Sequence, residues 1–308
     1  MKIFAYIEET PLCTIALRTA GRLAERLATD LVVMTSRTGM VVAEPQPPLG
    51  RDLPRAEWPA LPPGLALLTR ALAELEAIGV VARTEAIRIR EESGDVRVFR
   101  VAMAGGQVAA FQVRFGSPLA TIQAAVEGGG DCDLLVIADP GKRGLHRVVT
   151  TNLAHRAALD TMISVLGVKG DHLDSRVILC ADGSKSARRA YPLLRQLLPA
   201  LGGRVDVLGV RERLADDEVR ETCVICAERA RSWLVNAGKE STVHIKEGES
   251  AVEVILAEGG DDALIVLGAS LRSDLARRLK GSVPMHVMEK SRASVLLVKT
   301  LPEAETPL

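Results

Sequence analysis

The sequence predicts an α/β protein of two tandem doubly wound domains, each built on five parallel core strands. Two segments repeat one another, and their final lysines, Lys169 and Lys299, are 130 residues apart. Short apolar strands alternate with helical patterns in each half, which is typical of βαβ units and a parallel sheet covered on both faces. The 308 residues allow two domains of about 150 residues. We therefore expect a Rossmann-like arrangement in each half.

The two repeated segments are DCDLLVIADPGKRGLHRVVTTNLAHRAALDTMISVLGVK, residues 131–169, and GDDALIVLGASLRSDLARRLKGSVPMHVMEKSRASVLLVK, residues 260–299. Each contains an acidic turn, a strand, a loop with basic residues, a short helix and a closing strand. We place the boundary between the repeats near residue 170, which predicts domains 1–170 and 171–308.

Each half opens with an apolar strand, IFAYI in the first and VILCA in the second. An amphipathic helix follows each strand, because apolar residues recur at helical spacing. The predicted core-facing positions are Cys13, Leu17, Ala20, Ala24 and Leu27 in the first helix, and Ala187, Ala190, Leu194 and Leu197 in the second.

The N-terminal half carries two additions. Residues 43–63 hold seven of the fifteen prolines, which predicts an irregular or extended loop. Residues 80–115 alternate apolar and polar side chains between turn signals, and we interpret them as extra antiparallel strands.

The composition restricts the partners and the compartment. Lys plus Arg and Asp plus Glu number 39 each, so no net charge favours nucleic acid or an anionic membrane. The first apolar run ends at Glu8 and Glu9, and no run is long enough to span a bilayer, so we expect neither a signal peptide nor a membrane segment. The five cysteines are sparse and odd in number, which favours a reducing cytoplasm.

Two of the cysteines have the spacing Cys-x-x-Cys, at Cys223 and Cys226. With Val219, Ala230 and Trp233 they recur at steps of three and four, which predicts that both thiols lie on the apolar stripe of a helix. A zinc site would need a second such pair or two histidines, and the sequence has neither pattern.

A strand that ends at Gly268 leads into a basic segment and then into Gly281-Ser282. Gly281 can bring bare backbone close to a phosphate, and a helix that begins at Ser282 presents free N–H groups to an anion. The alternative is a solvated basic loop followed by an ordinary helix cap. The basic side chains are Arg272, Arg277, Arg278 and Lys280, with Lys142, Arg143, His146 and Arg147 as counterparts in the first repeat.

These features resemble the universal stress protein family, and in particular its tandem two-domain members. Nucleotide-binding members carry Gly-x2-Gly-x9-Gly-Ser/Thr after the fourth strand, an Asp at the end of the first strand and a Val at the end of the second. Leu271 takes the place of the second glycine here, and a leucine there either costs about 1–2 kcal/mol in a positive-φ position or fills part of the pocket. The resemblance implies an ATP or AMP site, with Mg²⁺ accompanying ATP, formed by Asp182, Val210, Gly268, Arg272, Gly281, Ser282 and Val283.

The N-terminal half matches the same motif less well. Its aligned positions hold Ala138, Gly141, Thr151 and Asn152, with Glu8 and Thr35 at the two strand ends. Asp139 places a negative charge in the loop where phosphates would sit. We expect this half not to bind a nucleotide in the family's manner.

Three functions remain open from the sequence. The first is a stress-response or regulatory protein that binds ATP or AMP in its C-terminal domain. The second is a member that binds no nucleotide and acts as an interaction scaffold through residues 43–63 and 80–115. The third is an ATP-using enzyme, and we expect at most slow ATP hydrolysis because the sequence offers no general base or pair of metal-binding carboxylates.

The resemblance also implies how the strands are arranged. The family's strand order is 3-2-1-4-5, and its dimers pair their closing strands antiparallel. We expect ISVLGVK and SVLLVK to pair in this way within one chain, which would make an intramolecular pseudo-dimer. Whether the whole chain also forms a homodimer is left open.

Overall fold

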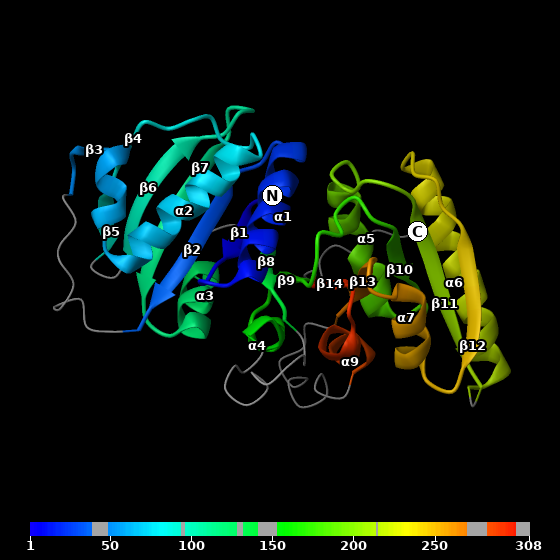
Figure 1. The fold of residues 1–308 in the computed structure, drawn as a ribbon. Helices are drawn as coiled ribbons and strands as arrows, with labels where there is room; N and C mark the ends of the chain where they lie inside the picture. Colours follow the sequence, from blue (N-terminus) through cyan, green and yellow to red (C-terminus); the bar gives the residue numbers. More distant parts are fainter. Residues whose placement is uncertain are drawn as a thin grey trace. The chain divides into compact units, whose positions relative to one another are not determined.

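The computed structural model of the protein describes residues 1–38, 49–93, 96–127, 132–140, 153–213, 215–269 and 282–299. The chain divides into two compact units, Met1–Ala138 and Asp139–Leu308 (Figure 1). The second unit therefore includes the closing helix and strand of the first sequence repeat. The domain boundary near residue 170, which concerns the repeats, stays a prediction.

The second unit contains the predicted sheet of five parallel strands. Its strand order is β12-β11-β10-β13-β14, which is the order 3-2-1-4-5 and confirms the predicted fold class. The strands are β10 (Val177–Cys180), β11 (Val205–Glu212), β12 (Val243–Gly248), β13 (Leu264–Gly268) and β14 (Ser294–Val298).

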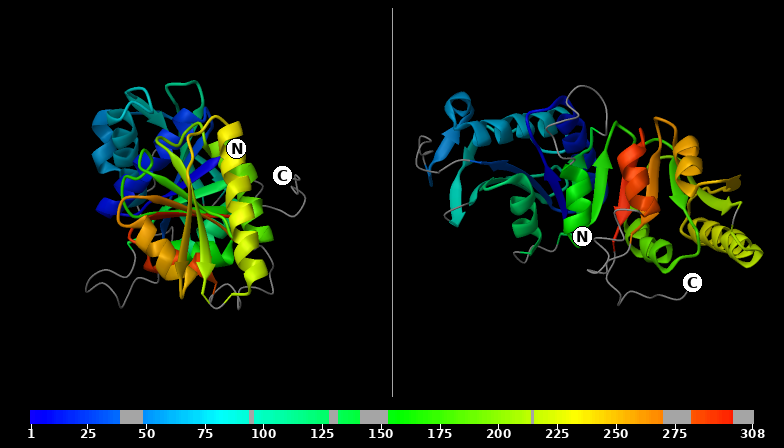
Figure 2. Two further views of the ribbon diagram at one scale, coloured as in Figure 1. Left: turned by 90° about the vertical axis from the view of Figure 1, so that its right-hand side faces the viewer. Right: turned by 90° about the horizontal axis from the view of Figure 1, so that it is seen from below.

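Helices cover both faces of this sheet (Figure 2). Helices α5 (Lys185–Leu197) and α6 (Asp217–Asn236) lie on one face, and α7 (Ala251–Gly259) and α9 (Val283–Lys290) lie on the other. Right-handed crossovers give this result. The chain moves from β10 through β11 to β12 in one direction, and then returns past β10 to β13 and β14 in the other. The predicted core-facing residues of α5 are buried, with Ala190 and Leu194 both at 0% exposure.

The closing strands of the two repeats pair antiparallel, as predicted. Strand β9 (Ser164–Val168) lies beside β14, with Leu166 opposite Leu296. Helix α4 (Leu153–Asp160) packs on β9 and against α9. The interpretation of this pairing as the centre of a pseudo-dimer stays a prediction.

The first unit has a mixed sheet in the order β8-β1-β2-β7-β6-β5. Its strands are β1 (Ile3–Tyr6), β2 (Leu31–Arg37), β5 (Arg90–Ser93), β6 (Val96–Ala102), β7 (Val108–Phe115) and β8 (Leu134–Ala138). A separate pair, β3 (Asp52–Pro54) and β4 (Ala86–Arg88), is antiparallel.

The interpretation of residues 80–115 as additional antiparallel strands is partly wrong. Strand β7 pairs parallel with β2 and so takes the third core position, while β5 and β6 form the antiparallel addition. The alternation of apolar and polar residues predicts strands but carries no information about their direction. Phe99 and Phe111 stack across β6 and β7, with ring centroids 4.8 Å apart.

Helices α1 (Pro11–Arg26) and α2 (Pro63–Ala77) cover one face of this sheet, and α3 (Pro118–Glu127) covers the other (Figure 2). The Thr10 hydroxyl caps α1 by accepting from the Cys13 amide. Of the Pro-rich stretch, residues 43–48 lie outside the described residues. The remainder includes β3, a 3-10 helix at Arg55–Ala60 and the first residue of α2, so the predicted loop is more ordered than expected.

Helix α6 differs from its predicted stripe. Cys223 is buried, but Cys226 is only half-buried and Val219 is 58% exposed. The core-facing side chains are Cys223, Ala227, Ala230 and Leu234. No helix in the described part of the chain is long and apolar enough to cross a membrane.

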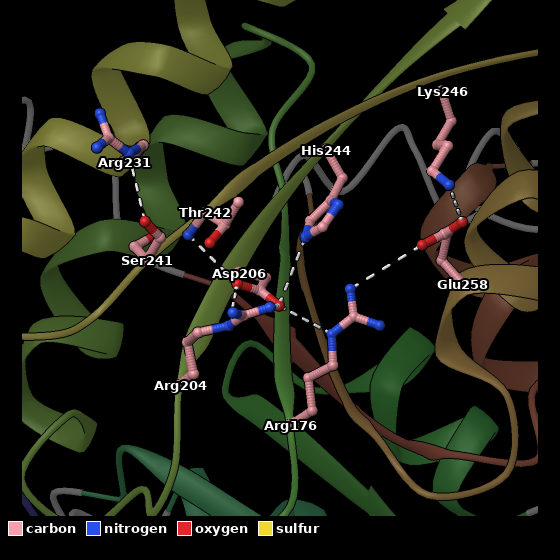
Figure 3. A network of polar contacts seen from close by, with 9 residues as sticks. All are labelled: Arg176, Arg204, Asp206, Arg231, Ser241, Thr242, His244, Lys246 and Glu258. Atoms are coloured by element: carbon pink, nitrogen blue, oxygen red, sulfur yellow. Dashed lines mark hydrogen bonds and ion pairs between the residues drawn. The ribbon is translucent and has the colours of Figure 1, made fainter.

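A polar network joins the strands at the amino ends of β10, β11 and β12 (Figure 3). The fully buried Asp206 accepts hydrogen bonds from Arg176 and Arg204, at 2.9 and 2.8 Å. Its other oxygen accepts from the Thr242 amide at 3.2 Å. Although burial raises the pKa of Asp206, the two guanidinium groups outweigh it and hold the pKa below its usual value. This network links the amino ends of the three strands.

Candidate functional site

A cavity of about 280 Å³ lies at the carboxyl ends of β10, β11 and β13. In doubly wound sheets this edge is where ligands bind, at the point where the strand order reverses. Here the reversal falls between β10 and β13. The lining residues include Cys180, Asp182, Ser184, Val210, Glu212, Val219, Cys223, Ala251, Gly268, Val283 and Pro284.

Four of the seven residues predicted for the site line this cavity, although they come from four separate segments. They are Asp182, Val210, Gly268 and Val283. Ser282 is the N-cap residue of α9, directly before Val283. Arg272 and Gly281, like Leu271, lie outside the described residues.

Asp182 is held at the mouth of the cavity by a tight turn between β10 and α5. Its Oδ1 accepts the Ser184 amide at 2.8 Å, and Gly183 supplies the positive φ of 79° that this turn requires. The Ser184 hydroxyl then caps α5 by accepting the Ala187 amide at 3.0 Å. The sequence Asp-Gly-Ser thus directs an exposed carboxylate toward the cavity.

Two thiols in the cavity wall were not predicted as site residues. Cys223 of α6 donates to the carbonyl of Val210 at 3.4 Å, so it fixes α6 against the end of β11. Burial, and then the nearby charge of Asp182, raise the pKa of both Cys180 and Cys223. Both thiols are protonated at neutral pH and are poor nucleophiles, which agrees with a structural role.

Gly268 is required by packing and not by open space for a ligand. A Cβ at this position would lie 1.9 Å from the carbonyl oxygen of Ser186 and 2.8 Å from the Cα of Ala187. The start of α5 therefore rests directly on the end of β13. The absent Cβ of Gly268 therefore leaves no room for a ribose or phosphate, because the backbone of α5 occupies that side.

The charged side chains among the described lining residues are both carboxylates, Asp182 and Glu212. Glu212 accepts the Ala251 amide at 3.0 Å and so caps α7. The N-terminus of α9, which starts at Val283, contributes positive potential to the described part of the site. Among the described residues no group of three His, Cys, Asp or Glu side chains is placed to hold a metal ion.

The corresponding residues of the first repeat have different surroundings. Glu8 is exposed and borders a separate cavity of about 360 Å³ between α1 and α2, and Thr35 is buried in β2. Asp139 is fully buried and forms an ion pair with Lys169 at 3.2 Å. Its charge is therefore balanced by Lys169 inside the protein, which corrects the expectation of a negative charge presented to phosphates. Gly141, Thr151 and Asn152 lie outside the described residues.

Comparison with known proteins finds a family match within the second unit. Residues 175–299 match the model of the universal stress protein family. No curated protein matches this sequence. Residues 175–299 are therefore a universal stress protein domain, as the motif predicted.

Solved structures extend the likeness to the whole chain. A universal stress protein from Archaeoglobus fulgidus DSM 4304 is 15% identical, with a TM-score of 0.62 over 98% of this chain and 97% of that one. A functionally unknown protein from Pseudomonas aeruginosa PAO1 is 17% identical, with a TM-score of 0.61 over 96% and 92%. The chain therefore has the fold of a tandem two-domain universal stress protein.

A universal stress protein in complex with cAMP matches less well. It is 14% identical, with a TM-score of 0.36 over 55% of this chain and 96% of its own. At this level the likeness carries no argument about the ligand of the present protein.

Proposed function

We propose that the protein is a regulatory universal stress protein that binds ATP or AMP in the cavity of its second unit. The observation that carries this proposal is the meeting of Asp182, Val210 and Val283 around one cavity at the carboxyl edge of the sheet. These residues were chosen from the family's nucleotide motif, and they lie far apart in the sequence. That these separate residues line a single cavity supports a nucleotide as its ligand.

The lining assigns different parts of the ligand to different walls. The apolar wall with Val210, Leu208 and Ile255 suits a purine base, and the carboxylates of Asp182 and Glu212 suit the donor groups of a base or ribose. Phosphates would be repelled by these carboxylates and would lie toward the N-terminus of α9, at Ser282 and Val283. Gly281 directly precedes this helix start in the sequence, Arg272 stands ten residues before Ser282, and the two complete the proposed set.

The same geometry argues against efficient ATP hydrolysis. One oxygen of Asp182 and one of Glu212 accept backbone amides, so each carboxylate serves a turn or a helix cap. Both lining thiols have raised pKa values. We therefore expect binding with at most slow turnover, and Mg²⁺ would be bound through the phosphates of ATP.

The test is calorimetric titration of ATP, with Mg²⁺, and of AMP into the full chain and two variants. Val219→Trp places a large side chain in the cavity from the exposed face of α6. Ile225→Trp is the matched control, because Ile225 is 51% exposed on the same helix and does not line the cavity. Thermal unfolding of both variants checks that neither is unfolded.

We expect one nucleotide per chain with a dissociation constant on the order of micromolar, which is about −8 kcal/mol. Binding should be lost in Val219→Trp and retained in Ile225→Trp. If the wild-type chain binds neither nucleotide at millimolar concentration, the proposal is wrong, and the remaining hypothesis is that the protein acts as an interaction scaffold. Equal binding by both variants would place the nucleotide elsewhere.

A further inference from the structure

Two lysines that end the closing strands each reach the helix of the other sequence repeat. Lys169, directly after β9, donates from Nζ to the carbonyls of Met288 and Ser291 at the C-terminal end of α9, at 2.6 and 2.8 Å. Lys299, directly after β14, donates to the carbonyls of Ala158 and Thr161 at the end of α4. Both side chains are nearly inaccessible to solvent.

Two serines complete the reciprocal arrangement. The Lys169 amide donates to the Ser294 hydroxyl at 3.0 Å, and the Lys299 amide donates to the Ser164 hydroxyl at 3.0 Å. Each serine begins the strand opposite, so the antiparallel pair β9–β14 is closed at both ends. An ammonium group at the carbonyl end of a helix interacts favourably with the helix dipole.

The two lysines differ in their surroundings. Helix α9 begins with Val283 and Pro284, both of which line the cavity of the second unit. Lys169, which holds the other end of α9, also pairs with Asp139 at 3.2 Å. At the position 130 residues after Asp139 the second repeat has Ala269, so Lys299 has no such carboxylate there. The lysine at the end of α9, the helix that adjoins the cavity, therefore makes an ion pair that the lysine at the end of α4 does not make with an equivalent residue.

The geometry points to Lys169 as a positioning residue for the nucleotide site, an inference that rests on the proposed function. Helix α9 has eight residues, about 12 Å, and is too short to be stable without tertiary contacts. Fixing its last carbonyls therefore also fixes its first residues beside the cavity. Strand β9 belongs to the first repeat, which matches the nucleotide motif less well. Through Lys169, this repeat contributes to the site of the second repeat.

The experiment compares Lys169→Met with Lys299→Met in the full chain. Both variants remove a buried lysine that donates to two helix carbonyls, and thermal unfolding of each checks that it folds. Only Lys169→Met should weaken ATP binding, by about tenfold, which is within the usual range of coupling between sites. Lys169→Arg should recover most of the affinity, because a guanidinium can reach the same carbonyls.

Hydrogen exchange without nucleotide separates this inference from the proposed function. Residues 283–290 should exchange faster in Lys169→Met, and residues 153–160 should do so in Lys299→Met. If the wild type binds no ATP, unchanged exchange of 283–290 in Lys169→Met would still refute the positioning role. Faster exchange there would support it.

The inference is overturned if Lys169→Met binds ATP as the wild type does, or if Lys299→Met loses as much affinity. Should Lys169→Met fail to fold, Lys169→Gln keeps an N–H donor group while it removes the charge and shortens the side chain by one atom. Its affinity for ATP should then be lower than that of the wild type. Wild-type affinity in Lys169→Gln would count against the charged interaction.

Discussion

Replacing Gly268 by alanine tests the contact between β13 and α5 that shapes one wall of the cavity. A Cβ at this position would lie 1.9 Å from the Ser186 carbonyl oxygen, whereas real Cβ atoms essentially never approach closer than 3.0 Å. The N-terminal turn of α5 would have to retreat by about 1.1 Å, the difference between these distances. The atoms in the way are backbone, so no rotamer change can relieve the clash.

The expected cost is about 2 kcal/mol. Overpacking of this kind costs about 1–3 kcal/mol, and more where backbone must move. Replacing glycine by alanine returns about 0.4–1 kcal/mol through the unfolded state. Gly268 is not among the residues with positive φ, so the cost is steric and contains no term for backbone strain.

Urea unfolding followed by the fluorescence of Trp233, in a Trp58→Phe background, reports on the second unit. Gly259→Ala is the control, because the nearest atom to its added Cβ is the flexible end of Ile265 at 2.5 Å. We expect the unfolding midpoint to fall in Gly268→Ala and to change little in Gly259→Ala. Equal midpoints in the two variants would refute the steric reasoning.

Two further predictions concern buried charges. Asp206→Asn should lower the free energy of unfolding by about 2–4 kcal/mol at neutral pH, because it leaves two guanidinium groups facing a neutral amide. The pKa of Asp206 is lower in the folded than in the unfolded chain, so its contribution to stability should be present above about pH 4. This contribution should disappear as the pH falls through the folded pKa. A difference in the free energy of unfolding that does not change with pH would contradict the prediction. Burial lowers the pKa of Lys299 to about 8, from 10.5 when unfolded, so the unfolded chain binds more protons between these values. The free energy of unfolding of the wild type should therefore rise by about 2–3 kcal/mol relative to that of Lys299→Met as the pH rises from about 8 to 10.5. A difference between the two chains that does not change with pH would contradict the lowered pKa.

The repeat pattern predicted most of the fold. The copies ending at Lys169 and Lys299 predicted equivalent strands and helices, and β9 and β14 pair as expected. The direction of β7 could not be predicted, because a strand between two neighbours has the same alternation whether it runs parallel or antiparallel. Its place depends on which edge of β2 is free, which is a property of the folded sheet.

The candidate site was predictable where a motif marks a strand end. Asp182 follows β10 and Val210 lies near the end of β11, and the structure places both at the cavity. Glu212, Ser184 and Cys223 were missed because helix caps and a thiol–carbonyl contact give no spacing signal. The buried pairing of Asp139 with Lys169 was also beyond prediction, since 30 residues separate them and the second repeat has alanine in place of the acid.

The central claim is that the second unit holds a nucleotide at the ends of β10, β11 and β13. Hydrogen exchange of the full chain with and without saturating ATP tests this most directly. The account predicts slower exchange in residues 180–187, 208–213 and 282–287, and little change in residues 1–38. Protection confined to the first unit, or no protection at millimolar ATP, would contradict it.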